Sequence, residues 1–178
     1  MVDPAFVEDF YSRHQELYEF LIERGEVTFA SDLAETFTRS LVLAIASYFE
    51  HDITEILTEI PAKRSNGDPV VTAMIVRQVI SRKYHTYFDW DNLKPGPFWA
   101  LMGPDFKTRA VADLKADDEK EQAVQAFLEL GQLRNKLVHQ NFVQFNVEKT
   151  PEELIQQFRS ALSFPAYVRE VLFGDQAS

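Results

Sequence analysis

The sequence predicts an all-α fold, a single-domain helical bundle built around a long central helix. Apolar side chains recur at helical spacing along most of the chain, and clusters rich in Pro, Gly and Asn separate these periodic stretches. An alternating strand pattern occurs only at residues 142–147, and one short strand would have nothing to pair with. The 178 residues suffice for one well-packed core, so we expect residues 1–178 to form a single domain.

The first two helices follow from periodic apolar residues between turn signals. Asp3 and Pro4 suit the cap and first turn of a helix that ends near Gly25. A second helix is expected from about Asp32 to Ile60, where apolar residues keep an i, i+4 pattern for almost thirty residues. This long helix is the expected spine of the fold.

Turn residues and aromatic residues dominate the middle of the chain. Residues 61–69 are rich in Pro, Asn and Gly, so the spine should end there, before a short apolar helix from Val70 to about Arg82. Between Lys83 and Asp105 six Tyr, Phe and Trp side chains alternate with Pro and Gly, which predicts irregular structure with at most short helices. We expect these rings to anchor the segment to the core, and stacking on nucleic-acid bases is the alternative.

Three more helices are expected in the C-terminal half. One covers residues 105–114, and an aspartate at 117–118 is expected to cap the next. That next helix carries apolar residues at helical spacing and has residues 133–142 at its C-terminal end. A capping-box pattern at residues 150–153 then begins a last helix, which ends within residues 162–172.

The composition is that of an acidic globular protein without cysteine. Hydrophobic residues make up 46% and charged residues 26%, as in ordinary folded domains. The net charge of −10 and the pI near 4.8 repel a polyanion on average, so any RNA site has to be a local basic pocket. The absence of cysteine excludes disulfides, thiolate metal ligands and a cysteine nucleophile, and no cofactor or metal ion is expected.

The chain shows no sequence signal for export or membrane insertion. Its first residues lack a basic stretch followed by an apolar run, so no signal peptide is expected. The longest apolar stretch, residues 41–46, is far shorter than the ~20 residues that a membrane helix needs. We therefore expect a soluble cytoplasmic protein without a membrane partner.

A polar face at the C-terminal end of the helix capped at residues 117–118 carries the candidate chemistry. Each residue of a helix turns by about 100°, so Asn135 and His139 share one face and Arg134 lies beside it. Another face, expected to hold this turn against the core, carries Leu133, Leu137 and Val138. The pattern predicts a rigidly supported groove flanked by an arginine and a histidine.

The pattern Arg134-Asn135-x-x-x-His139, within residues 133–142, resembles the signature of the HEPN superfamily. Three further segments resemble its ribonuclease-like branch, RiboL-PSP-HEPN: residues 47–50 of the long helix, the aromatic residues 84–90 and the element at residues 103–106. The resemblance implies a helical domain that forms homodimers in which two motif helices meet. It also implies that many such domains cleave RNA without a metal ion.

The resemblance and the chemistry of RNA cleavage together suggest a role for each motif residue. Attack by the neighbouring 2′-hydroxyl needs a base, an acid for the leaving 5′-oxygen and a cation against the phosphate charge. One chain supplies one motif histidine, so we expect Arg134 and His139 of both subunits to line a cleft across a two-fold axis. Asn135 is expected to orient the motif or a phosphate oxygen, and Lys136 to contact the RNA backbone. Glu50 is expected to pair with Arg134.

Three interpretations of the protein are open. The first is an endoribonuclease of the toxin or phage-defence kind, which cleaves tRNA or other RNA, leaves a 2′,3′-cyclic phosphate and is restrained by an antitoxin or another neutralising partner. The second is a non-catalytic HEPN dimer that binds RNA, a nucleotide or a protein. In the third the bundle is purely structural, with Arg134 in an ion pair and His139 at the negative end of a helix dipole.

The remaining histidines and one departure from the family pattern complete the expectations. His14, His51 and His85 show no ligand spacing and are expected at or near the surface. Some toxin members of the family carry a tyrosine two positions after the motif histidine, which a partner enzyme adenylylates. That position is Asn141 here, so control by this route is not expected.

Overall fold

The computed structural model describes residues 3–142 and 144–174, and the regular elements in that part of the chain are helices. In chain order they are α1 (Ala5–Glu23), α2 (Val27–Arg64), α3 (Pro69–Ile75), the π-helical turn η1 (Val76–Ile80), the 3-10 turn η2 (Tyr84–Thr86), α4 (Gly96–Ala100), α5 (Pro104–Lys115), α6 (Asp118–His139), α7 (Pro151–Ala161) and α8 (Ser163–Phe173). Residue 142 and residues 144–147 form no strand, and Val143 lies outside the described residues. The prediction of an all-α fold is confirmed.

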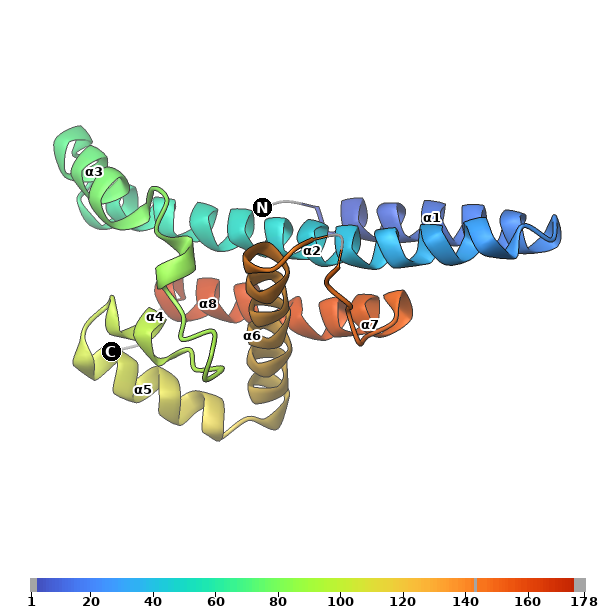
Figure 1. Cartoon of the computed structure of the whole chain (residues 1–178). Helices are drawn as coiled ribbons and strands as arrows, with labels where there is room; N and C mark the ends of the chain where they lie inside the picture. Colours follow the sequence, from blue (N-terminus) through green and yellow to red (C-terminus); the bar gives the residue numbers. More distant parts are fainter. Residues whose placement is uncertain (1–2, 143, 175–178) are drawn as a thin grey trace.

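The helices pack around the long α2. Figure 1 shows α1 alongside the first half of α2, while α7 and α8 run below α2 and α6 crosses them steeply. α3 lies at the far end of α2, and α4 and α5 form a separate corner next to α6 and α8. Within the described residues, no helix is both long enough and apolar enough to span a membrane.

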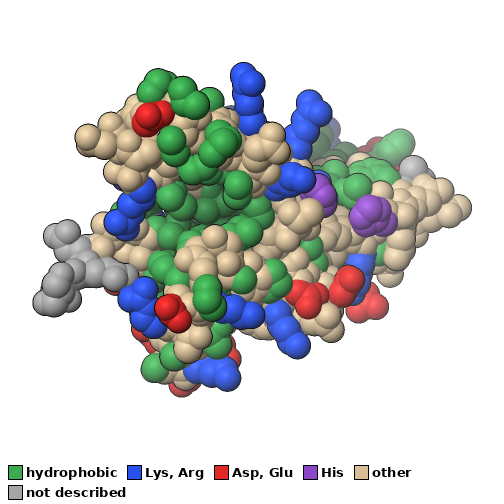
Figure 2. Space-filling view, turned by 90° about the vertical axis from the view of Figure 1, so that its left-hand side faces the viewer, with side chains coloured by type: hydrophobic (Ala, Val, Ile, Leu, Met, Phe, Trp, Pro, Cys, Tyr) green, Lys and Arg blue, Asp and Glu red, His purple; other side chains and the backbone are tan. Residues whose placement is uncertain are grey.

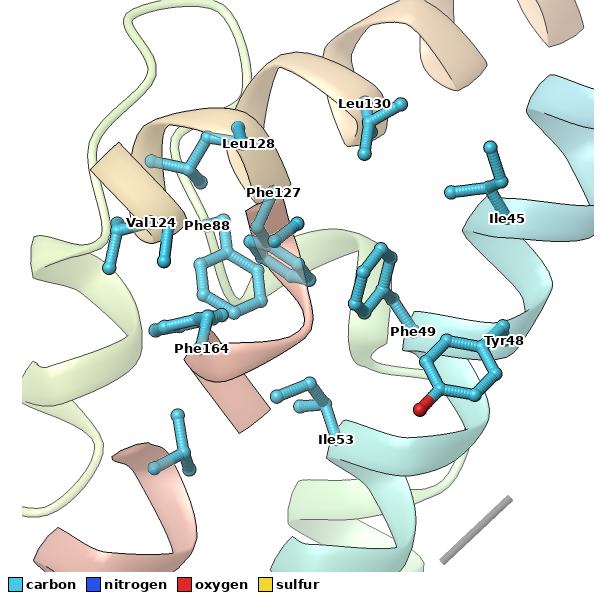
Figure 3. Packing of buried hydrophobic residues seen from close by; sticks show 14 of the residues in the cluster. Ile45, Tyr48, Phe49, Ile53, Phe88, Val124, Phe127, Leu128, Leu130 and Phe164 are labelled. Carbon is cyan, nitrogen blue, oxygen red and sulfur yellow. The ribbon is translucent and has the colours of Figure 1, made fainter. Parts of the chain in front are cut away.

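Aromatic side chains from distant segments meet in the core. Phe49 of α2 lies edge-on to Phe127 of α6 at a centroid distance of 5.3 Å, and Phe127 contacts Phe164 of α8 at 4.6 Å (Figure 3). Phe88, from the irregular segment, stacks on Phe98 at 4.9 Å. Buried aromatic residues of this segment are Tyr87, Phe88, Trp90, Phe98 and Trp99. The prediction that these rings anchor the segment to the core is therefore confirmed.

The capping residues named from the sequence cap the expected helices. The side chain of Asp117 accepts hydrogen bonds from the first backbone N–H groups of α6, and Thr150 and Glu153 form a capping box at α7. The Asp3 carboxylate accepts a hydrogen bond from Ala5 N at 2.9 Å, at the start of α1. These polar side chains accept hydrogen bonds from the free N–H groups of the first helical turn. Their positions in the sequence therefore predict where these helices begin.

The spine is longer than predicted, and a proline lies inside it. α2 begins at Val27 and ends at Arg64, about one turn beyond each predicted boundary. Pro61 lacks an N–H group and loses one helical hydrogen bond, but the residue is buried and its carbonyl accepts a bond from Ser65 N at 2.9 Å. Burial of the ring offsets the lost bond, so the predicted helix end at this proline is wrong.

Two predicted helices are each divided in the structure. The helix expected at residues 70–82 consists of α3 and η1, and the chain turns away at Arg82, whose φ is 59°. The last helix is divided at Leu162 into α7 and α8. Pro165 in the first turn of α8 has no N–H to donate to the carbonyl of Ala161, which explains a break at this place.

Candidate functional site

The motif helix α6 is held firmly along one side. Leu130 and Leu137 are each 1% exposed and belong to the main hydrophobic cluster, while Leu133 is half-buried against it. Val138 is 50% exposed, so its predicted place on the core face is wrong. Val138 follows Arg134 by four residues, and this spacing places it on the same polar side of the helix.

Ten residues from three parts of the chain enclose a pocket of about 280 Å³ at the C-terminal end of α6. We call it the motif pocket, and its lining residues are Ala46, Glu50, Tyr84, His85, Trp90, Gly131, Arg134, Asn135, Val138 and His139. Four of the five predicted site residues are therefore brought together. Lys136 is the fifth, and it is exposed and donates a hydrogen bond to Gln132 Oε1 at 2.9 Å.

Gly131 allows the wall of the motif pocket to form. A Cβ atom at this position would lie 2.0 Å from a carbon of the Trp90 ring, so only glycine permits the indole to pack this closely on α6. The indole nitrogen donates to the carbonyl of His85 at 3.0 Å. Gln132 donates to the carbonyls of Trp90 and Asp91 at 3.0 and 3.2 Å. These contacts attach the irregular segment to the motif helix.

Arg134 is half-buried and is oriented by its neighbour on the helix. Its Nη1 donates a hydrogen bond to Asn135 Oδ1 at 3.1 Å. Glu50 lines the same pocket from α2, yet no ion pair within 4 Å joins Glu50 to Arg134 in the described part of the chain. The direct pairing expected for Glu50 is therefore not observed in the single chain. A carboxylate and a guanidinium instead face one pocket.

Tyr84 lies between these two charges. Burial, and after it the Glu50 carboxylate, raise the pKa of the Tyr84 hydroxyl well above its ordinary value of 10.0, whereas the Arg134 charge lowers it. The Tyr84 ring contacts Trp90 at a centroid distance of 5.7 Å. At neutral pH Tyr84 is therefore a neutral phenol, a group that can donate a hydrogen bond to a ligand.

His85 is the functional candidate that sequence reasoning missed. It was expected at the surface, and it is exposed, but it also lines the motif pocket with His139. Its neighbour Tyr84 belongs to the aromatic stretch whose family resemblance was noted, and this was the one signal that favoured it. His14 is buried against Phe37, with ring centroids 3.5 Å apart, and His51 lies in a groove between α1 and α2.

The groups in the motif pocket suit chemistry on a phosphate ester. An imidazole transfers protons near neutral pH, and a guanidinium can bind two phosphate oxygens at once. Both kinds of group are accessible here, because His85 and His139 are exposed and Arg134 is half-exposed. Among the described residues no three His, Asp or Glu side chains are grouped so that they could hold a metal ion.

Comparison with known proteins assigns the chain to a family. A family model described as RiboL-PSP-HEPN matches residues 8–172, which is nearly the whole chain. The chain belongs to the RiboL-PSP-HEPN family. Searches among curated proteins and among solved structures find no match.

The RiboL-PSP-HEPN match includes every segment that builds the motif pocket. The lining residues fall between Ala46 and His139, well inside the matched range. In this HEPN chain the long helix, the aromatic segment and the motif helix each contribute at least one polar side chain, namely Glu50, His85 and Arg134. The pocket therefore lies wholly within the part of the chain that the family model matches.

Proposed function

We propose that the protein is a metal-independent endoribonuclease that acts as a homodimer through Arg134 and His139. The observation that carries the proposal is that both side chains line one solvent-accessible pocket in a chain of the HEPN family. Proteins that share one fold can have different functions. The proposal therefore rests on the chemistry of the site and not on the family alone.

The proposed reaction is attack by the 2′-hydroxyl of RNA on the adjacent phosphorus. One imidazole takes the proton from the 2′-hydroxyl while the O2′–P bond forms, and another gives a proton to the 5′-oxygen as the P–O5′ bond breaks. The products are a 2′,3′-cyclic phosphate and a 5′-hydroxyl. Arg134 would bind the non-bridging oxygens as negative charge grows on them. Asn135 would hold the guanidinium through the hydrogen bond at 3.1 Å.

A second copy of the chain would supply the second imidazole. His139 is exposed at the end of α6, and Val138 and Phe142 beside it are 50% and 38% exposed. An apolar pair next to the motif suits a contact across a two-fold axis, where the same surface meets itself. In that arrangement the two His139 side chains act as base and acid on opposite sides of one phosphate. Lys136, outside the pocket, would contact the RNA backbone.

The biological role that we propose is that of a toxin or phage-defence nuclease in the cytoplasm. Its substrate would be tRNA or another RNA, and an antitoxin or other neutralising partner would restrain it. The competing function is a non-catalytic HEPN dimer that binds RNA, a nucleotide or a protein through the same pocket. An intact motif supports the enzyme, because Arg134 and His139 supply a phosphate-binding cation and a proton-transfer group together.

The deciding experiment is incubation of the purified protein with total RNA in the presence of EDTA. We expect cleavage by the wild type, with 2′,3′-cyclic phosphate ends, and a loss of at least about 100-fold in R134A and H139A. R13A and H51A, which remove an exposed arginine and an exposed histidine outside the pocket, are the matched controls. Equal cleavage by all five proteins would indicate a contaminating nuclease, and binding without cleavage would favour the competing function.

A further inference from the structure

Charge is divided unevenly along this acidic chain. Residues 61–115 carry nine of the 18 Lys and Arg side chains but five of the 28 Asp and Glu side chains. The net charge of this segment is +4, while the rest of the chain carries −14. A polyanion repelled by the molecule as a whole is attracted to this segment within a Debye length, about 8 Å at physiological salt.

Five exposed cations of this segment have no hydrogen-bond or ion-pair partner for their side chains within the described residues. We call them the basic face, and they are Arg77, Arg82, Lys83, Lys94 and Lys107. Cations elsewhere are commonly neutralised by carboxylates, as Lys120 is by Asp113 at 3.1 Å and Arg159 by Glu8 at 2.7 Å. The basic face is thus free to bind an external anion without breaking an ion pair.

Two cations of the basic face adjoin the motif pocket in the chain. Arg82 and Lys83 directly precede Tyr84 and His85, which line the pocket. Consecutive Cα atoms are about 3.8 Å apart, so the backbone of both cations lies within one or two steps of the pocket wall. The turn keeps Arg82 at φ 59°, a left-handed conformation that residues with a side chain rarely adopt.

Lys94 and Lys107 lie at or near the turn that follows Trp90. Lys94 pairs with Asp89 through two backbone hydrogen bonds of 3.0 and 3.1 Å, next to Trp90 of the pocket wall. The Lys107 side chain reaches from α5 to Gly96, where a Cβ would lie 3.3 Å from its Cε. The tight turn at residues 89–94 therefore connects Lys94 with the pocket wall at Trp90.

The surface between α3 and the α4–α5 corner is hollowed and apolar. Figure 2 shows hydrophobic side chains in its centre, Lys and Arg side chains around it and histidine side chains at its edge. Exposed apolar residues of α3, of η1 and of the C-cap of α4 are Val70, Met74, Val79 and Leu101. The bases of single-stranded RNA have apolar faces that can cover such a surface while the backbone remains near the cations.

We propose that the basic face binds the phosphate backbone of single-stranded RNA and leads it into the motif pocket. This inference rests on the proposed function, because it supplies the path by which a phosphate linkage reaches Arg134 and His139. Charge complementarity and continuity with the pocket both favour RNA as the occupant. The path also explains how a chain with a net charge of −10 attracts a polyanion at one place only.

The test measures binding of a labelled single-stranded RNA by fluorescence anisotropy in an H139A background, which prevents cleavage. R82Q/K83Q and R77Q/K94Q each remove two cations of the basic face, and R13Q/R24Q removes two exposed cations, one in α1 and one at its C-cap. For each basic-face pair we expect a roughly tenfold weaker affinity at about 50 mM salt, and a salt slope smaller by about 1 to 2. The α1 pair should change the affinity by less than roughly threefold.

The outcomes separate this inference from the proposed function. An equal loss of affinity in R13Q/R24Q would overturn the proposal that the basic face binds RNA, because the net charge of the protein alone would then explain binding. Binding to vesicles with anionic lipid, without binding to RNA, would also overturn it. If the wild-type protein binds RNA through the basic face but does not cleave it, the result contradicts the proposed nuclease activity and supports the proposed RNA-binding surface. Circular dichroism of each variant checks folding, and the two independent pairs guard against a folding defect in one of them.

Discussion

Arg134 owes its orientation to Asn135 of its own helix. The hydrogen bond of 3.1 Å between them leaves the rest of the guanidinium available to a ligand, since no carboxylate within 4 Å pairs with it in the described chain. Glu50 and Tyr84 complete the surroundings, one as a carboxylate across the pocket and the other as a protonated phenol. At this scale the pocket combines an oriented cation with hydrogen-bond donors, which suits binding of a phosphate.

His85 provides a prediction at the residue scale. If the two His139 side chains of a dimer are acid and base, H85Q should lower kcat/KM for RNA by less than about tenfold, because His85 then only helps to bind substrate. H139A should lower it by at least about 100-fold. H51Q is the matched control on α2. A loss in H85Q as large as that in H139A would mean that acid and base come from one chain.

At the scale of elements, the close packing of α6 on the irregular segment shapes the site. Trp90 reaches the helix backbone at Gly131, and Gln132 holds the carbonyls of Trp90 and Asp91. The same ring contacts Phe127, with centroids 5.8 Å apart, so the pocket wall continues into the core. A change at this contact should affect stability and the site together.

Gly131→Ala tests this contact. Alanine favours the helix by about 1 kcal/mol over glycine, but its Cβ would lie 2.0 Å from the Trp90 ring, and overpacking typically costs about 1–3 kcal/mol. We expect a net loss of stability, a shift in tryptophan fluorescence and weaker RNA binding. Urea denaturation measures the first effect, with Gln125→Ala at an exposed position of α6 as the control. A more stable variant with unchanged fluorescence would contradict the observed packing.

The contact between α1 and α2 should be sensitive to pH. His14 stacks on Phe37, and burial lowers its pKa below the ordinary value of 6.5, although the Glu152 carboxylate opposes this shift. The unfolded chain therefore binds a proton at a higher pH than the folded chain does. The stability contributed by neutral His14 is present above pH 6.5 and is lost as pH falls through the folded pKa.

His14→Phe retains the stacked ring and removes its titration. We expect the free energy of unfolding of the wild type to fall more steeply than that of H14F as pH falls below 6.5. Burial raises the pKa of Asp52, which has the opposite effect on stability, so the comparison of the two proteins isolates His14. Chemical denaturation across this pH range makes the measurement, with H139A as an exposed-histidine control. Parallel curves for wild type and H14F would reject the assignment.

At the scale of the whole molecule, charge and apolar surface are arranged for contact with other molecules. Residues 61–115 carry a net positive charge, and exposed apolar residues lie beside the motif at Val138 and Phe142. One main hydrophobic cluster joins residues from α1 to α8. We propose that the chain unfolds as a single domain and that its active form is a dimer.

The oligomeric state gives the prediction at this scale. We expect a dimer in solution, one cooperative unfolding transition and a midpoint that rises with protein concentration. Val138→Asp places a charge beside the motif and should yield a monomer with little nuclease activity. Val27→Asp, at an exposed apolar site near the start of α2, is the control and should remain dimeric. Light scattering after size-exclusion chromatography measures both, and an active wild-type monomer would refute the shared cleft.

Local signals in the sequence determined the helices, most of their starts and the motif helix. Capping at Asp117 and Thr150 depends on hydrogen bonds within one turn, so a few neighbouring residues suffice to predict it. The i, i+4 pattern likewise predicted α2, and the Arg134-to-His139 spacing predicted the candidate site. These features are set by interactions between residues close together in the chain.

Tertiary structure alone decided what depends on contacts between distant segments. Pro61 remains in a helix because the fold buries it, and Val138 faces outward because Leu137 occupies the core. His85 joins His139 in one pocket because Trp90 packs on Gly131, a contact between residues 41 positions apart. Apolar periodicity shows which residues prefer burial, but packing of distant segments decides which polar side chains meet.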